Sequence, residues 1–591
     1  MLVVAVLLAL PAAVSGVGPS PVAADGPGDD GVEPAEPPPD GTCRVDAPGD
    51  SGETGQAQTA GRENRSAGTE GSVSSPAEPD GDSPDGPRIV AVYPNPHARG
   101  DRGEFVVLSV PDGTDLSGVI LDDGEDRVAL PNTTAGGRAA VTPDPARARN
   151  LTDAAVVGVD ALELSNAGER IRLRHDGVVV DAVAYEDAPE GELRRQAGAT
   201  GDEWEWWPLA GTDRAPADLP ARAATAFVLP DAPAITVETL RSADRRILLA
   251  GYTLTSPRVV RALRAAADRG VRVRVLVDSA PVGGMDRRQG EALNALVEVG
   301  VDVRVFGGER APYRFHHAKY AVVDDRALVL TENFKPAGTG GRSSRGWGAV
   351  VEGPAVAREL AAVFRADTRE STSIPWREYR RNASFVEGDP ANGSYPSRFD
   401  PRRVPLDGVR VLVAPDNAER GLVRVLCGAE ESILVQQMTV EPGPLLWATM
   451  AAARRGVRVR VLASGARYVR GDNRRTVRRL NRWADREGVD LRAKVADPRS
   501  RFEKVHAKGV VVDGDRAVVS SVNWNTHSPR ENREVAVVLE GDRAGSYFAR
   551  VFRADWRDGA WRLPAGVVGL VVLTVGTAVA VARRRIRFAA T

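Results

Sequence analysis

The spacing of apolar and polar residues divides the chain into segments of different character. Over 87–190, short alternating runs are separated by Gly, Asp, Asn and Pro, which predicts a small all-β sandwich. From about 225 onward, continuous apolar runs alternate with segments of helical periodicity, a pattern typical of α/β domains. The chain is therefore predicted to be multidomain, with all-β structure first and α/β structure after it.

The α/β pattern occurs twice, in 225–365 and in 405–556. The first half is predicted to have strands at 246–252, 271–277 and 301–306, and helices at 257–268 and 288–299. The second is predicted to have strands at 432–437 and 457–462, and helices at 443–454 and 474–487. The heptapeptide GVRVRVL stands at 270–276 and again at 456–462. This repetition favours two homologous halves joined by a connector over 366–404.

The ends of the chain differ from these domains. Residues 1–24 hold a short apolar run, with Val22-Ala23-Ala24 as one cleavage site, and resemble a secretory signal without a basic n-region. Residues 25–86 are rich in Gly, Pro, Asp, Glu and Ser and are predicted to form a disordered acidic linker. Residues 564–582 are uncharged and mostly apolar, and the basic tail 583–591 follows. We therefore predict a C-terminal transmembrane helix, single-pass placement in the cell membrane, and the bulk of the chain outside the cell.

Composition changes this picture at two points. The 591 residues carry a formal net charge of −2, so overall charge gives no indication of nucleic-acid binding. Lysine occurs only at positions 319, 335, 494, 504 and 508, whereas arginine is abundant. With only Cys43 and Cys427 present, a disulfide framework is excluded as the organising principle, and Cys427 is interpreted as a small buried hydrophobe.

Two of the rare lysines belong to a motif that each half contains once. The pattern H-x-K-x4-D consists of His317, Lys319 and Asp324 in the first half, and of His506, Lys508 and Asp513 in the second. Alternate residues of an extended strand share a face, so the His and Lys of each motif point the same way. Two such edges brought together would present two imidazoles and two ammonium groups to one anion. This arrangement indicates chemistry on a phosphodiester.

The paired motif resembles that of the phospholipase D superfamily, over about 225–555. The family's motif continues to a Gly/Ser-x-Asn element, matched by 520–523 in the second half. In the first half 331–333 matches if the preceding turn is one residue shorter. The resemblance implies duplicated α/β halves and a phosphodiesterase that requires no metal and no cofactor.

The resemblance also implies roles for single residues. One neutral imidazole attacks phosphorus and forms a phosphohistidine, and the other protonates the leaving oxygen and then acts as a base. Spacing leaves open which histidine attacks, and family precedent favours His317. Phosphate oxygens would be held by Lys319, Lys508, Asn333 and Asn523. The motif aspartates Asp324 and Asp513 are expected to brace the motif.

In this family an acidic residue after the motif often orients an imidazole. Glu534 fits this role in the second half, whereas the matching stretch 345–348 of the first half has no acid. Three alternatives stay open: Glu332 compensates, a group from the other half does so, or one histidine is less well tuned. His316 is expected to face away from His317.

The sandwich resembles a lamin-tail domain, an immunoglobulin-like module. The matching segments are YPNP (93–96), GEFVVL (103–108), TDLSGVILDDG (114–124) and 164–185. Domains of this kind bind partners and carry no catalytic residues, so the resemblance implies an unknown surface partner.

Three functions are consistent with the sequence. The first is a membrane-anchored, extracytoplasmic phosphodiesterase that hydrolyses or transfers a phospholipid headgroup ester. The second is an extracellular nuclease of the same superfamily, whose Arg-rich run 467–482, with Tyr468 and Trp483, would track phosphates; a solvated helix face is the simpler interpretation of that run. The third is a non-catalytic surface binding or adhesion protein.

Overall fold

The computed structural model describes most of the chain between residues 86 and 557. The described residues are Cys43, 86–96, 102–149, 151–197, 203–209, 211, 214–307, 312–369, 372–388, 390–498, 500–557, 573–574 and 577–580. The signal-like segment 1–24, the basic tail 583–591 and most of the linker 25–86 lie outside the described residues.

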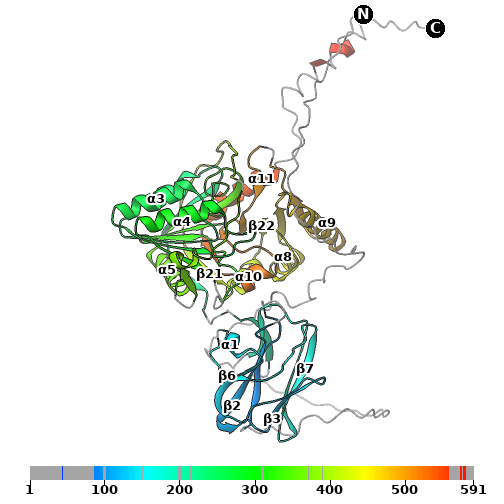
Figure 1. The fold of residues 1–591 in the computed structure, drawn as a ribbon. Helices are drawn as coiled ribbons and strands as arrows, with labels where there is room; N and C mark the ends of the chain where they lie inside the picture. Colours follow the sequence, from blue (N-terminus) through cyan, green and yellow to red (C-terminus); the bar gives the residue numbers. More distant parts are fainter. Residues whose placement is uncertain are drawn as a thin grey trace, which may run out of the picture.

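The N-terminal domain is a sandwich of two β-sheets (Figure 1, blue to cyan). Its elements are β1 (Arg88–Tyr93), β2 (Phe105–Asp115), β3 (Val119–Asp122), β4 (Arg127–Ala129), β5 (Thr134–Thr142), α1 (Pro145–Ala148), β6 (Ala155–Gly158), β7 (Gly168–His175), β8 (Val178–Glu186), β9 (Glu192–Ala197) and β10 (Glu203–Pro208). One sheet has the order β10-β9-β1-β2-β5-β6 and the other β4-β3-β7-β8. Apolar residues of both sheets, such as Val106 and Leu173, share one core, as alternating burial in strands requires. The lamin-tail resemblance of this domain stays a prediction.

The sandwich continues past residue 190, because β9 and β10 belong to its larger sheet. Strand β10 carries Trp204, Trp206 and Trp207. Trp207 contacts the second half, since the guanidinium carbon of Arg420 lies 4.1 Å from the centre of its ring. Arg530 adds an ion pair of 2.9 Å to Glu192. These contacts join the sandwich to the α/β part of the chain.

The α/β part consists of two halves with corresponding elements. The first half contains β12 (Ala223–Leu229), α2 (Ala234–Arg241), β13 (Arg246–Gly251), α3 (Pro257–Asp268), β14 (Arg272–Asp278), α4 (Arg287–Glu298), β15 (Asp302–Phe306), β16 (Tyr320–Val323), β17 (Arg326–Leu330), β18 (Ser344–Glu352) and α5 (Pro354–Asp367). The second contains β21 (Gly408–Ala414), α7 (Ala418–Cys427), β22 (Ser432–Gln437), α8 (Pro444–Arg454), β23 (Arg458–Ala463), α9 (Arg470–Glu487), β24 (Leu491–Val495), β25 (Lys504–Val505), β26 (Lys508–Val512), β27 (Arg516–Ser520), α10 (His527–Glu531), β28 (Glu534–Glu540) and α11 (Asp542–Arg557). The strand order β15-β14-β13-β16-β17-β18-β12 corresponds to β24-β23-β22-β26-β27-β28-β21. The predicted duplication is confirmed, and the repeated heptapeptide supplies the equivalent strands β14 and β23.

Short strands outside the repeated pattern tie the halves together. Strand β11 (Ala217–Leu219) precedes the first half but pairs with β21 of the second. The predicted connector supplies β19 (Ser373–Pro375), α6 (Trp376–Tyr379) and β20 (Arg402–Pro405), and β20 pairs with β12 of the first half. Buried apolar residues of both halves form one core, in which Trp347 stacks on Phe548 at 4.6 Å between ring centres. This shared core fixes the edges of the halves against each other, and the candidate site lies where these edges meet.

The predicted transmembrane helix over 564–582 is wrong as an element of the described fold. Among the described residues, no helix is both long enough and apolar enough to cross a membrane. Inside 564–582 the structure describes only helical residues at 573–574 and 577–580, and the other positions lie outside the described residues.

The interpretation of Cys427 as an unpaired hydrophobe is also wrong. Cys427 forms a disulfide with Cys43, which lies in the segment predicted to be a disordered linker. The two cysteines are 384 residues apart in sequence, so no local pattern could indicate their pairing. Disulfides persist in oxidising compartments. The placement of the bulk of the chain outside the cell stays a prediction.

Candidate active site

The two H-x-K edges meet at the boundary between the halves. Each lies against the start of a strand that belongs to the opposite half. The His317 N–H donates to the carbonyl of Arg533 at 2.9 Å, just before β28, and the His506 N–H donates to the carbonyl of Arg345 at 3.0 Å, on β18. The structure therefore brings the two predicted motifs into one site with approximate twofold symmetry.

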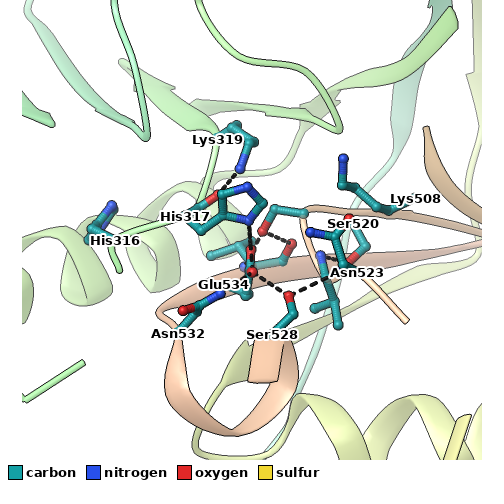
Figure 2. Close-up of polar contacts among 12 residues, drawn as sticks. His316, His317, Lys319, Lys508, Ser520, Asn523, Ser528, Asn532 and Glu534 are labelled. Atoms are coloured by element: carbon teal, nitrogen blue, oxygen red, sulfur yellow. Dashed lines mark hydrogen bonds and ion pairs between the residues drawn. The ribbon is translucent and has the colours of Figure 1, made fainter. Parts of the chain in front are cut away.

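His317 is oriented by a carboxylate from the second half. Its Nδ1 lies 2.8 Å from Oε1 and 3.0 Å from Oε2 of Glu534, as Figure 2 shows. Glu534 is fully buried, and its Oε1 also accepts hydrogen bonds from the Ser528 hydroxyl and, at 3.3 Å, from the Asn532 amide. A carboxylate can only accept here, so Nδ1 of His317 carries the proton and Nε2 keeps its lone pair. Glu534 thus acts across the boundary between the halves and not within its own half.

His506 is oriented by a carboxylate from the first half. Its Nδ1 lies 3.3 Å from Oε2 of Glu332 and 3.2 Å from the carbonyl oxygen of Thr331. Of the three alternatives that the sequence left open, the structure places Glu332 against the second imidazole. Each histidine is therefore faced by an acid from the other half.

The two motif lysines are buried beside the imidazoles. Lys508 Nζ donates to the His506 carbonyl at 2.8 Å, and Lys319 Nζ donates to the His317 carbonyl. Within the described part of the chain, neither ammonium has a carboxylate at ion-pair distance. Burial lowers the pKa of Lys508 to about 8 and also lowers that of Lys319. Positive charge that is not directly paired inside the protein is a strong attractant for an anion.

Burial also controls the protonation of the two imidazoles. It lowers the pKa of His317 and of His506 to about 4, against the opposing effects of Glu534 and Glu332 respectively. Both rings are therefore neutral near pH 7 when no anion is bound. A neutral ring with a free Nε2 is what nucleophilic attack requires.

The predicted asparagines also lie in this buried region. In the described structure, Oδ1 of Asn333 and Oδ1 of Asn523 are buried and have no hydrogen-bond partner. Buried polar atoms are usually satisfied, and exceptions concentrate where a ligand would complete the set. Both side chains follow β17 and β27 at equivalent places, so they flank the site from the two halves.

The motif aspartates, predicted to brace the motif, lie in turns at the far ends of its strands. Asp324 accepts hydrogen bonds of 2.9 Å from the backbone N–H groups of residues 244, 245 and 246. Asp513 accepts equivalent bonds from residues 430, 431 and 432 at distances down to 2.7 Å. Both adopt positive φ, 54° and 53°, a conformation that Asp tolerates. These contacts support bracing and not proton transfer.

Replacing Asp513 by alanine is expected to lower stability while leaving catalysis nearly intact. The variant loses three backbone contacts, which should reduce the free energy of unfolding by about 1–3 kcal/mol. The value of kcat/KM should stay within about threefold of wild type while the protein is folded. The matched control is Asp515→Ala, whose half-exposed carboxylate pairs with Arg516 at 3.3 Å; it should change stability by less than about 0.5 kcal/mol. Urea titration and initial rates measure both quantities, and a large kcat loss in folded Asp513→Ala would contradict bracing.

His316, beside the reactive histidine, has the opposite environment. It is fully buried, and its Nε2 lies 3.2 Å from Asp367 Oδ2. Figure 2 shows its ring directed away from that of His317. The expectation that His316 faces away from His317 is confirmed, although both residues precede β16.

Several residues at the site were not predicted from the sequence. The ring of Tyr252 contacts His317 edge-on at 4.8 Å between centres, and Lys319 Nζ lies 5.4 Å from the centre of the same ring. Ser528 and Asn532 hold Glu534, as described above. Tyr252 directly follows β13. Ser528 lies in α10 and Asn532 directly after it, in a segment without a counterpart helix in the described first half, so no sequence signal pointed to them.

Comparisons with known proteins agree with this geometry. The family described as "Cardiolipin synthase, PLD-like domain" matches residues 236–368 and 422–556. Curated relatives include cardiolipin synthase B of Shigella flexneri, 28% identical over 47% of this chain, and cardiolipin synthase A of Erwinia tasmaniensis, 27% identical over 50%. The chain spans 65% and 60% of the lengths of these relatives, less than two thirds of each.

Solved structures with remote similarity include a phosphatidylserine synthase of Haemophilus influenzae Rd KW20. It is 13% identical with a TM-score of 0.45, covering 58% of this chain and 88% of that one. The phospholipase D family member Nuc of Salmonella typhimurium is 20% identical with a TM-score of 0.22, covering 29% of this chain and 100% of its own. The matched family covers both halves that carry the paired motif, and the chain therefore belongs to the phospholipase D superfamily.

Proposed function

We propose that this protein cleaves or transfers the headgroup ester of a phospholipid through a covalent phosphohistidine. The observation that carries the proposal is the meeting of two H-x-K edges in one buried site, each with a carboxylate on Nδ1 of its histidine. This arrangement supplies a nucleophile, an acid and two cations to a single phosphodiester.

In the first step, Nε2 of His317 attacks phosphorus. The N–P bond forms while the bond from phosphorus to the leaving oxygen breaks, and His506, in its protonated form, gives that oxygen a proton. The negative charge of a bound phosphodiester favours protonation of His506, whose pKa in the empty site is low. Glu534 stabilises the positive charge that develops on the His317 ring.

In the second step, the now neutral His506 takes a proton from water or from an alcohol. The resulting oxygen attacks phosphorus, the N–P bond breaks, and His317 is restored. Water gives hydrolysis and an alcohol gives transfer. Lys319 and Lys508 stabilise the charge on the non-bridging oxygens in both steps, because they are fixed before the reaction begins.

The relatives named cardiolipin synthase support a phospholipid as substrate. The surface of the second half is compatible with an anionic lipid layer: on α9 the arginines at 470, 474, 475, 478 and 482 are exposed. Tyr468, just before α9, is 62% exposed and lies under Lys504, whose Nζ is 5.4 Å from the ring centre. Trp483 is buried beneath Arg454, so it offers no face on which a nucleic-acid base could stack.

The test compares substrates with the purified full chain in EDTA. We expect phosphatidylglycerol vesicles to yield phosphatidic acid in water and a new phosphodiester when a primary alcohol is added, both detected by mass spectrometry. Single-stranded and duplex DNA should stay intact. The matched control is the double variant His317→Ala/His506→Ala, which should be inactive on vesicles. Degradation of DNA with intact vesicles would support the nuclease, and no turnover of any diester would favour the binding protein.

A further inference from the structure

We propose that Glu332 is the positioning residue of His506 and that it replaces, from a different place in the fold, the acid missing at Gly346. The first half has thereby moved its acid from the strand β18 to the loop after β17. Only the expected change in turnover rests on the proposed function, whereas the expected effect on the titration of His506 does not.

The backbone shows that Gly346 is the counterpart of Glu534. The residue before each, Arg345 or Arg533, accepts the N–H of the opposite motif histidine. The strand registers agree as well. Leu330 pairs with Gly348, two residues after Gly346, and Ser520 pairs with Ala536, two residues after Glu534. The second half therefore carries its acid where the first half has no side chain.

The loops show that Glu332 is the counterpart of Val522. Thr331 N–H donates to the Trp347 carbonyl at 3.0 Å, and Ser521 N–H donates to the Val535 carbonyl at 2.9 Å. Glu332 and Val522 are the next residues in their loops. The second half thus has its acid on the strand, at Glu534, and an apolar residue in the loop, at Val522. The first half has the reverse arrangement, with glycine on the strand and the acid Glu332 in the loop.

Steric contacts explain why the exchange involves both positions. A Cβ atom added at Gly346 would lie 2.1 Å from Cγ of Glu332, far inside any tolerated contact, and one added at Gly338 would lie 2.6 Å from Glu332 Oε2. The Glu332 side chain therefore occupies the space that a side chain at 346 would fill. Glutamate at both 332 and 346 is incompatible with this backbone.

The surroundings of the two acids differ in a way that indicates a function for Glu332. Glu332 is only 2% exposed, and within the described structure its Oε1 has no hydrogen-bond partner, whereas Glu534 has Ser528 and Asn532. A buried, incompletely solvated carboxylate costs stability. The other oxygen of Glu332, Oε2, faces His506, and this contact offsets the cost in stability.

The carboxylate of Glu332 is expected to favour the protonated form of His506. The charged groups that face this ring are Lys508 on β26, Lys319 before β16 and Glu332 after β17. Glu332 is the one that raises the pKa of the ring, while both lysines lower it. Removing its charge should lower the pKa of His506 and reduce the fraction of the ring that can act as an acid.

The experiment uses Glu332→Val, which installs the residue found at the counterpart position, and the double variant Glu332→Val/Gly346→Glu. For Glu332→Val we expect kcat on vesicles to fall about 10–100-fold, as for other residues that orient a reactive side chain, with a smaller change in KM. The alkaline limb of the pH profile of kcat/KM should move to lower pH. The double variant should recover at least tenfold in kcat and return the limb toward its original position.

A second readout does not depend on turnover. Histidine NMR titration of the full chain should show the His506 resonance titrating at lower pH in Glu332→Val and returning in the double variant, with His317 unchanged. Glu332→Gln, which keeps the shape of the side chain, serves the same purpose if the valine variant does not fold. The control is Glu352→Gln on β18, whose carboxylate pairs with exposed Arg403 and should affect neither readout.

The outcomes separate the two proposals. An unchanged His506 titration in Glu332→Gln and Glu332→Val, or a double variant no better than the single one, would overturn the role of Glu332. A wild-type chain that turns over no phosphodiester but shows the expected NMR shifts would overturn the proposed function and leave the positioning role intact.

Discussion

Replacement of His317 by alanine is expected to reduce phosphodiester turnover by at least about 10⁴-fold, because it removes the atom that bonds to phosphorus. His506→Ala should behave differently on an activated ester. The leaving group of bis-p-nitrophenyl phosphate needs no proton, so the first step proceeds while the second, which needs a base, is slow. We therefore expect a burst of one p-nitrophenol per site and an accumulated adduct on His317. Rapid-quench kinetics and intact-protein mass spectrometry measure both.

A histidine outside the site provides the control for this experiment. His175→Ala, in the β-sandwich, should leave turnover unchanged. A burst in His317→Ala that is absent in His506→Ala would reverse the two roles. Equal activity of wild type and both variants would show that the site does not perform the chemistry proposed.

The sequence was sufficient to predict the components of the site but not their partners. H-x-K spacing, strand alternation and the repeated heptapeptide indicated that His317 and His506 would meet, because these signals lie within single elements or compare one half with the other. The pairing of Glu534 with His317 crosses the boundary between the halves. No spacing within either half contains that information, so Glu534 was assigned within its own half.

The wrong predictions of the fold have a similar origin. The Cys43–Cys427 disulfide joins a segment of low-complexity composition to a core helix, and composition alone indicated no structure there. The hydropathy of 564–582 indicated a membrane span, whereas the described residues contain no helix suited to one. Local patterns predicted local elements well, and failed where a long-range contact decided the outcome.

One long-range feature has a large expected effect on stability: a buried arginine at the start of β28. Arg533 Nη1 lies 2.6 Å from Asp416 of its own half, and Nε lies 3.1 Å from Asp367 of the other half. Arg345 repeats this arrangement, with Asp231 at 2.5 Å and Asp555 at 2.9 Å. Each arginine thus links a carboxylate of its own half to one of the opposite half.

We expect Arg533→Met to lower the free energy of unfolding by about 3–5 kcal/mol, because it removes the cation that two buried carboxylates share. For a unit of this size, that loss corresponds to a fall of about 1 M or more in the urea midpoint. Turnover should fall as well, since the Arg533 carbonyl accepts the N–H of His317 and the next residue is Glu534. Circular dichroism and initial rates at low urea measure the two effects.

The loss in the free energy of unfolding should depend on how deeply the ion pair is buried, and not on the presence of an ion pair alone. Arg403 makes an equally short contact of 2.7 Å with Glu352, but its side chain is 65% exposed. Arg403→Met should therefore cost no more than about 1 kcal/mol, because water solvates the carboxylate that remains. Arg345→Met should also be more destabilising than Arg403→Met, since both carboxylates of Arg345 are buried. If Arg533→Met were no more destabilising than Arg403→Met, Arg533 would not help to hold the two halves together, and the position of His317 would not depend on this arginine.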